Sequence, residues 1–218
     1  RHTLFPYTTL FRSAFLTAHV ARCMTPFERR TRACQDRLAE AGADAVVLFP
    51  SRNLLYLTGF DEEPAERHLF LFVPCDGAPV FLVPDLYETQ VRAESWVADV
   101  ETWSDDENPV AAVRTIVSDL SLGDGRVLVD DTMWARFTQD LRAVLPNAEF
   151  GLASDVVAPL RATKDDAELD ALRRAGGVAD RVVERLRDVG ERCLGMTEAE
   201  LAAEIERLLA EEGGEGVA

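Results

Sequence analysis

Residues 45–60 read AVVLFPSRNLLYLTGF and join an apolar run to a turn and a short motif. The run Ala45–Phe49 holds no polar residue, a pattern typical of a strand that is buried on both faces of a sheet. Pro50–Asn53 then predict a turn, which the Asn53 side chain is expected to fix by bonding to the backbone. Gly59 is expected to fix a second turn through a positive φ, because glycine has no Cβ to oppose it.

Strand and helix patterns alternate on both sides of this stretch. Thr25–Glu28 form a capping box with proline at the first helical position, and Gly42 marks the end of the helix that they begin. Asp76-Gly77 predicts a hairpin turn. Further helices are expected to begin at Asp85, Asn108 and Trp134, and further strands at 68–73, 80–83, 97–103, 126–130 and 149–152. The alternation predicts an α/β fold with a mixed sheet and helices on its faces.

The pattern changes near Pro159. Acidic residues at 165, 166 and 168 favour the start of a helix that ends at Gly190, and a second capping box at Thr197–Glu200 begins another helix. Both helices carry an apolar stripe, but no strand follows for them to cover. We therefore expect that a covering sheet is missing and that this part of the chain is loosely held.

These patterns predict three segments. Residues 1–23 hold three Arg and no Asp or Glu, and residues 1–13 resemble translated sequencing-adaptor sequence. They are expected to be a non-native leader before a true start at Met24, with a functional N-terminal arm as the alternative. Residues 24–160 are expected to form the α/β domain, and residues 161–218 the truncated start of a second domain.

The net charge of the chain excludes some classes of binding partner. The chain has 23 Lys and Arg against 39 Asp and Glu, a net charge of −16, and Lys164 is its single lysine. The electrostatic field of a chain with this negative charge repels nucleic acid and anionic membranes, so neither is expected as a partner. No apolar run is long enough to predict a membrane span. The excess of acidic residues predicts a salt-rich cytoplasm, because salt screens the repulsion between their carboxylates. A genome rich in G and C, which favours arginine codons, is the alternative explanation for the lack of lysine, but it does not explain the excess of acid.

The residue types that carry chemistry are sparse and scattered. The sequence has no nucleophile elbow, phosphate loop or zincin motif. The four cysteines form no CxxC pair and are interpreted as free thiols of a reducing compartment: Cys23, Cys34, Cys75 and Cys193. None of the three histidines has a partner at metal-ligand spacing: His2, His19 and His68. The sequence therefore predicts no catalytic residue and no metal ligand in this chain.

Other conspicuous residues receive structural interpretations. The acids Asp105–Glu107 and Asp130-Asp131 are interpreted as chance neighbours in an acidic chain. His68 lies in an apolar strand pattern and is expected to be a packed histidine. The three tryptophans are expected in the core or at a domain interface: Trp96, Trp103 and Trp134.

Three motifs, in order along the chain, carry a family resemblance. Ser51–Phe60 resembles the S-x-N-[IL]-x-Y-L-T-G-F segment of the creatinase/prolidase N-terminal domain. Leu160–Leu169 is similar to the L-R-x-x-K-x-x-x-E-[IL] helix that opens the pita-bread metallopeptidase domain, and Gly195–Leu201 resembles the second helix of that domain. The resemblance covers 24–218, and its structural motif positions are Asn53, Thr58, Gly59, Phe60, Arg161, Lys164 and Glu168.

The resemblance implies a fold and an activity for the parent protein. The family includes Xaa-Pro aminopeptidases, Xaa-Pro dipeptidases and creatinase. The implied fold is a ribonuclease-H-like mixed-sheet domain, followed here by the first two helices of an incomplete pita-bread domain. Peptidase members cleave X-Pro bonds with two divalent metal ions, manganese or cobalt, whose ligands come later in the fold. The resemblance thus implies an inactive chain that holds no cofactor.

The resemblance also implies partners and two residues near the substrate. The expected partners are the missing C-terminal catalytic domain, a second subunit in a homodimer, and a proline-containing peptide. Tyr56 and Arg67 are the two residues nominated near substrate, with Arg67 placed to pair with a substrate carboxylate. The favoured alternative is that Tyr56 is a core aromatic and Arg67 a surface charge that offsets Glu62, Glu63 and Glu66. A free-standing binding or dimerisation module and a creatinase-like amidinohydrolase half stay open as alternative functions.

Overall fold

The computed structural model describes residues 24–214 of the 218-residue chain, so the expected leader at 1–23 lies outside the described residues. Helix α1 (Pro26–Ala41) begins and ends where the sequence predicts. The Glu28 N–H donates to Thr25 Oγ1 at 3.1 Å, and the Thr25 N–H donates to the Glu28 carboxylate. Gly42 ends the helix with φ +63°, in the left-handed region that glycine enters without a steric penalty.

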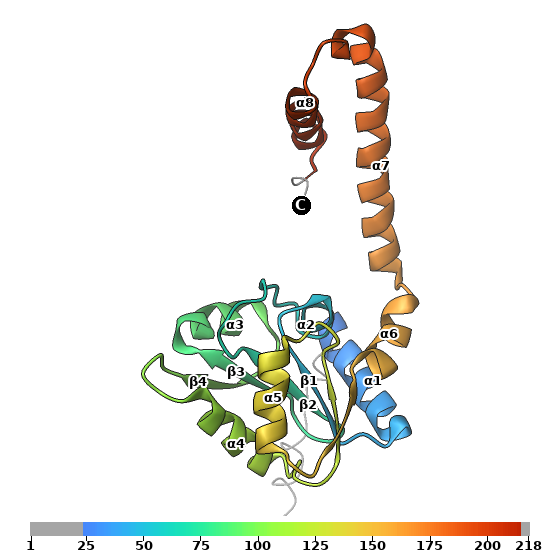
Figure 1. Cartoon of the computed structure of the whole chain (residues 1–218). Coiled ribbons are helices and arrows are strands. Elements are labelled where there is room, and N and C mark those ends of the chain that lie inside the picture. The colour runs from blue at the N-terminus through green and yellow to red at the C-terminus, as the bar shows by residue number, and fades with distance from the viewer. Residues whose placement is uncertain (1–23, 215–218) are drawn as a thin grey trace, which may run out of the picture. The chain divides into compact units, whose positions relative to one another are not determined.

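A six-stranded mixed sheet lies at the centre of the fold (Figure 1). Its order is β4-β3-β2-β1-β5-β6, and β2 runs antiparallel to both of its neighbours while the other pairs are parallel. The strands are β1 (Ala45–Leu48), β2 (Phe70–Pro74), β3 (Val80–Pro84), β4 (Asp99–Trp103), β5 (Arg126–Val129) and β6 (Glu149–Leu152). The predicted mixed-sheet α/β fold is confirmed.

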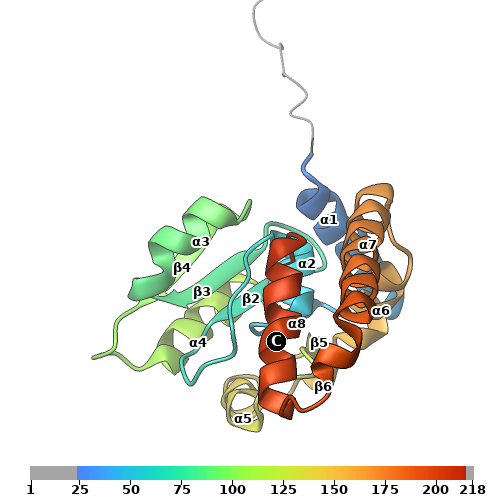
Figure 2. The ribbon, with the colours of Figure 1, turned by 90° about the horizontal axis from the view of Figure 1, so that it is seen from above.

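Helices cover both faces of the sheet. One face packs against α1, α2 (Arg52–Thr58), α3 (Glu88–Glu94), which follows the 3-10 turn η1 (Asp85–Tyr87), and α6 (Ser154–Ala162). The other face packs against α4 (Pro109–Asp119) and α5 (Ala135–Val144), and Figure 2 shows α3 and α4 on opposite sides. Because side chains alternate along a strand, β1 sends Val46 and Leu48 into the first layer and Ala45 and Val47 into the second.

Two short helices differ from the expectations. The turn predicted at Pro50–Asn53 becomes the start of α2 at Arg52, because the Ser51 hydroxyl accepts hydrogen bonds from the N–H groups of Asn53 and Leu54. No helix is predicted at 154–162, yet α6 forms there with Pro159 inside it. Its buried pair Val156 and Val157 packs against the sheet, and this tertiary contact outweighs the N–H that proline lacks.

Internal contacts divide the chain into two units, Arg1–Leu160 and Arg161–Ala218. The second unit contains α7 (Asp166–Val189), the 3-10 turn η2 (Gly190–Cys193) and α8 (Glu198–Glu211). Arg185 joins the two helices by ion pairs to Glu211 and Glu212. Val182 and Leu208 are buried, whereas other large apolar side chains of this unit are exposed: Leu172, Val183, Leu194 and Met196.

The thiols differ in their surroundings. Cys34 on α1 is buried, and this burial raises the pKa of its thiol to about 12. Cys75 in the first unit and Cys193 in the second are partly exposed, and all three are free. Between residues 24 and 214, no helix combines the length and the apolar character that a membrane crossing requires.

Candidate functional site

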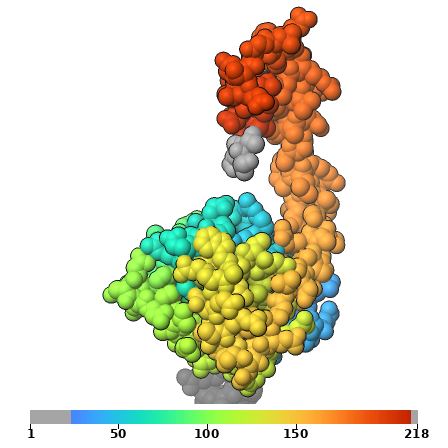
Figure 3. Space-filling view, viewed as in Figure 1, coloured from blue at the N-terminus to red at the C-terminus, as the bar shows by residue number. Residues whose placement is uncertain are grey.

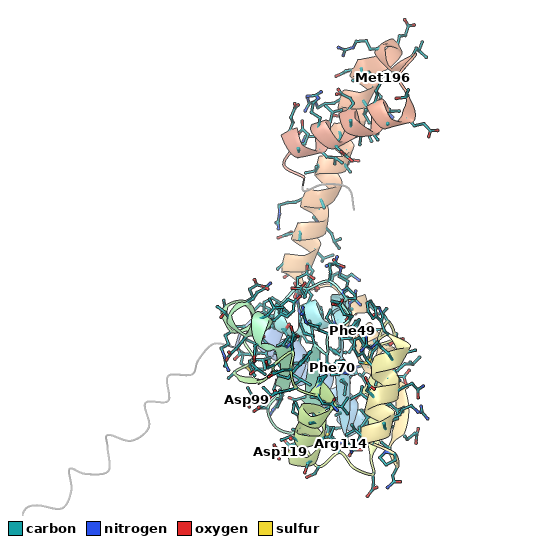
Figure 4. All side chains as sticks on the ribbon, turned by 60° about the vertical axis from the view of Figure 1, so that its left-hand side comes forward. Phe49, Phe70, Asp99, Arg114, Asp119 and Met196 are labelled. Atoms are coloured by element: carbon teal, nitrogen blue, oxygen red, sulfur yellow. The ribbon has the colours of Figure 1, made fainter. Side chains whose placement is uncertain are left out.

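Five strands end at one edge of the sheet, which we call the carboxyl edge. Because β1, β3, β4, β5 and β6 run in one direction, the segments that follow them all emerge there, and the segment 61–69 that leads into the antiparallel β2 lies at the same edge. Ligands of open α/β sheets bind at this edge. Phe49, at the end of β1, and Phe70, at the start of β2, are labelled in Figure 4.

Asp130 lies where the helices diverge at this edge. The chain leaves β1 toward α2 on one face and leaves β5 toward α5 on the other, which is the arrangement that opens a crevice in many α/β folds. Asp130 is only 2% exposed. Its Oδ2 accepts hydrogen bonds from Ser51 Oγ at 2.6 Å and Asn53 Nδ2 at 3.2 Å. Its Oδ1 accepts bonds from the N–H and hydroxyl of Thr132 at 3.0 and 2.7 Å.

The bonds of Asp130 correct one interpretation of the sequence and add a contact to another. Asp130 is a structural centre and not a chance neighbour of Asp131, whose own carboxylate accepts the N–H of Ser154 at 2.9 Å and so caps α6. The Asn53 side chain, expected to bond to a turn backbone, reaches Asp130 across the sheet edge. The polar side chains that surround Asp130 at this edge are therefore bonded to its carboxylate. Figure 3 shows the cyan and yellow parts of the chain side by side on the surface of the first unit.

Arg67 forms a two-point ion pair at the same edge. Its Nε lies 3.1 Å from Asp105 Oδ1 and its Nη2 lies 2.8 Å from Asp105 Oδ2. The carboxylate, on the segment after β4, raises the pKa of the partly exposed guanidinium above its ordinary value. The pairing shows that Arg67 presents the planar donor geometry that a carboxylate requires. Its ion-pair partner is Asp105, and the charge of Glu66 also raises the pKa of Arg67, by less than Asp105 does.

Tyr56 lies on α2 and is engaged elsewhere. Its hydroxyl donates to the carbonyl of Leu160 at 3.2 Å, and the guanidinium of Arg30 lies 4.4 Å from its ring centre. The ring is half-buried against the core layer of α1, α2, α3 and α6. The bonds described here thus join the two nominated residues to different partners, Tyr56 to Leu160 and Arg67 to Asp105.

The other motif residues of the first unit shape the end of α2. Thr58 Oγ1 donates to the Leu54 carbonyl at 2.8 Å and accepts the Phe60 N–H at 3.1 Å. Gly59 ends the helix with φ +85°, and a Cβ there would lie 2.8 Å from the ring of Phe27. Phe60 is buried and meets Phe81 edge-on. The motif thus specifies a helix end and its packing.

The motif residues of the second unit also act on helix ends. Lys164 Nζ donates to the carbonyls of Arg161 at 2.7 Å and Ala162 at 3.3 Å, which are among the last carbonyls of α6. Asp165 and Glu168 form a reciprocal capping box at the start of α7. These contacts explain the K-x-x-x-E spacing by helix capping.

His68 is packed in the core, as the sequence predicts. Its ring is 4% exposed, its Nε2 lies 2.9 Å from Asp140 Oδ2, and the rings of Phe70, Trp103 and Phe137 meet it edge-on. Burial lowers the pKa of His68, and Asp140 opposes that shift only in part. Through the bond to Asp140, His68 links the segment that leads into β2 to α5.

The described residues form surface depressions but no metal-binding cluster. Across residues 24–214, no three His, Cys, Asp or Glu side chains are grouped so that they could hold a metal ion. Two open depressions, of about 590 and about 350 Å³, lie at the opposite edge of the sheet. Arg114 lines the larger, and Asp99 and Asp119 line the smaller; all three are labelled in Figure 4.

The family model described as the creatinase/prolidase N-terminal domain matches residues 30–163, more than half of the chain. The chain belongs to the creatinase/prolidase N-terminal domain family. The resemblance inferred from the three motifs is confirmed.

Two similar proteins are named as dipeptidases. The chain is 31% identical over 183 residues to a putative dipeptidase, YkvY, of Bacillus subtilis, which covers 83% of this chain and 49% of the relative. The crystal structure of dipeptidase PepE from Mycobacterium ulcerans matches with a TM-score of 0.78 and 31% identity, covering 88% of this chain and 51% of that one.

An isolated domain has the same fold. The creatinase/prolidase N-terminal domain of an X-Pro dipeptidase from Streptococcus pyogenes matches with a TM-score of 0.50 and 24% identity, covering 57% of this chain and 98% of that one. The present chain spans about half the length of the curated relatives it matches.

Proposed function

We propose that this chain is the non-catalytic N-terminal part of an Xaa-Pro peptidase. The observation that carries the proposal is its match to half the length of proteins named as dipeptidases. The internal bonding of the carboxyl edge supports it, because Asp130, Ser51 and Asn53 are occupied with one another. In this proposal the chain packs on a catalytic half, supports a homodimer and borders the mouth of the active site.

The catalytic half would supply the chemistry of hydrolysis. Two divalent metal ions, manganese or cobalt, would activate the water that attacks an X-Pro bond. Arg67 is the residue of this chain that we assign to substrate, because a guanidinium that binds the Asp105 carboxylate at two points can bind a peptide carboxylate in the same way. No residue of this chain is assigned to the metal ions.

The activity test compares this chain with the longer product of its gene. The 218-residue chain is expected to release no proline from an X-Pro dipeptide in the presence of Mn²⁺, whereas a protein that continues through the reading frame after Ala218 is expected to do so. The frame should encode two Asp, two or more His and two Glu, of which the Asp, the Glu and one His would be metal ligands. Turnover by the 218-residue chain would contradict the proposal.

The same experiment separates the two alternative functions. A stop codon directly after Ala218 would favour a free-standing binding or dimerisation module. Urea released from creatine, with no proline released from dipeptides, would favour a creatinase-like amidinohydrolase. Each outcome replaces the peptidase proposal by a different one.

A salt-rich cytoplasm is also part of the proposal, supported by the net charge of −16. Screening of carboxylate repulsion by 2 M KCl is expected to raise the melting temperature by about 5 °C relative to 50 mM KCl. Sucrose at the same osmolarity serves as the control, because it does not screen charge. Equal effects of KCl and sucrose on the melting temperature, measured by calorimetry, would contradict a charge-based cause.

A further inference from the structure

The sheet has two edge strands, β4 and β6, and an arginine lies across the first of them. The guanidinium of Arg92, on α3, donates to the carbonyls of Ala98 at 3.4 Å and Val100 at 3.3 Å. Glu88 accepts the Arg92 Nε–H at 2.9 Å and so holds the guanidinium in place. A side chain in this position occupies backbone acceptors of the edge strand and places a charge beside them. Both features oppose the addition of another strand, so β4 is a closed edge.

The edge of β6 is open by comparison. The N–H groups of Glu149 and Ala153 donate to carbonyls of the β5 side at 3.0 and 2.8 Å. Because successive residues of a strand direct their backbone groups to opposite sides, the N–H and C=O groups of Phe150 and Leu152 point outward. Across residues 24–214, no side chain bonds to these outward groups as Arg92 does on β4.

The side chains along this open edge are apolar on one face. Leu152 is 51% exposed and lies in register with Val129, which packs in the layer of α4 and α5. Phe150 lies on the same face and is partly buried, with the guanidinium of Arg142 5.1 Å from its ring centre. An open edge strand with an exposed apolar side chain is a surface on which another strand can pair.

A second copy of this chain fits the edge without placing like charges opposite each other. Two copies related by a twofold axis at Phe150 would run antiparallel, and the two Phe150 residues would exchange backbone hydrogen bonds. Leu152 would then lie opposite Ala148 of the other copy, and Glu149 would lie opposite Gly151. Glu149 is the single charged residue of β6, so the strand avoids its own charge in this register.

We propose that β6 is the edge at which a second copy of this chain pairs, and that Arg92 stops the assembly at a dimer by closing β4. Pairing of β6 with β6 uses the same surface on both copies, so it leaves no β6 edge free. An open β4 would allow the sheet to continue from each end of the dimer. The inference rests on the homodimer of the proposed function. Its test measures association and not hydrolysis, so its failure would leave the peptidase activity standing.

Sedimentation equilibrium of the full chain in 0.5 M KCl measures the pairing, because the salt screens the repulsion between two acidic copies. A monomer–dimer equilibrium is expected. Leu152→Lys places a charge at the pairing edge of each copy, and we expect it to raise the dissociation constant about tenfold or more. Leu86→Lys is the matched control, because Leu86 is 63% exposed on the turn after β3, and three strands separate β3 from β6. Its dissociation constant should stay within about twofold of the unsubstituted chain.

A third variant tests the closed edge. Arg92→Ala is expected to add species larger than the dimer, whereas Arg114→Ala, which removes an exposed arginine of α4, should add none. An unsubstituted chain that stays monomeric at every concentration would overturn the proposal. Equal effects of Leu152→Lys and Leu86→Lys would overturn the pairing at β6, since the dimer would then form through another surface. An Arg92→Ala chain that stops at the dimer would overturn the role of Arg92.

Discussion

Replacing Asp130 by alanine is expected to lower the free energy of unfolding of the first unit by about 3 kcal/mol. The change removes the acceptor for four hydrogen bonds that Ser51, Asn53 and Thr132 donate to a carboxylate that is only 2% exposed. Urea unfolding followed by tryptophan fluorescence measures the loss, because all three tryptophans lie in this unit.

Two further variants sharpen this prediction. Asp130→Asn keeps one oxygen acceptor, and about half of the loss is expected. Asp106→Ala removes an exposed acid with no hydrogen-bond partner within the described residues, and a change within about 0.5 kcal/mol is expected. If Asp130→Ala and Asp106→Ala had equal effects, the loss would come from net charge and not from the network around Asp130.

Replacing Gly59 by alanine is expected to cost about 2 kcal/mol of unfolding free energy in the same assay. The φ of +85° places an L-residue in the left-handed region, and the new Cβ would lie 2.8 Å from Phe27. About half of the cost comes from the backbone conformation, and the rest comes from displacement of the Phe27 ring from α2.

Gly42→Ala provides the matched control for Gly59. Gly42 also ends a helix with a positive φ, +63°, but no atom lies within 4 Å of its added Cβ, so about 1 kcal/mol is expected. The difference between the two alanine variants then measures the contact with Phe27. In a Phe27→Ala background this difference should vanish. A difference that persists there would show that Phe27 is not its cause.

The ends of a helix could be predicted where the capping residues lie within a few positions of each other in the sequence. The capping boxes at Thr25 and Thr197 combine a hydroxyl and a carboxylate three residues apart, so the sequence alone identifies both helix starts. α2 and α6 were missed because they are short and their starts rely on distant residues. The cap of α2, Ser51, is itself held by Asp130, and the start of α6 is held by Asp131.

The candidate site was less predictable than the fold. The partner of Arg67 lies 38 residues away in the chain, and no local pattern connects the two. Asp130 did carry a signal, because it is a polar residue directly after a strand that is buried on both faces. Because the chain is acidic and Asp131 follows directly, the pair was interpreted as a chance occurrence and the position of Asp130 was not recognised.

The surroundings of the cysteines have a practical consequence. At neutral pH the Cys34 thiol stays protonated and enclosed, so alkylating reagents should spare it. Cys75 and Cys193 are partly accessible, and one lies in each unit. With Cys23 replaced, a maleimide donor–acceptor dye pair would mark each unit once, so energy transfer could follow their separation without an engineered attachment point.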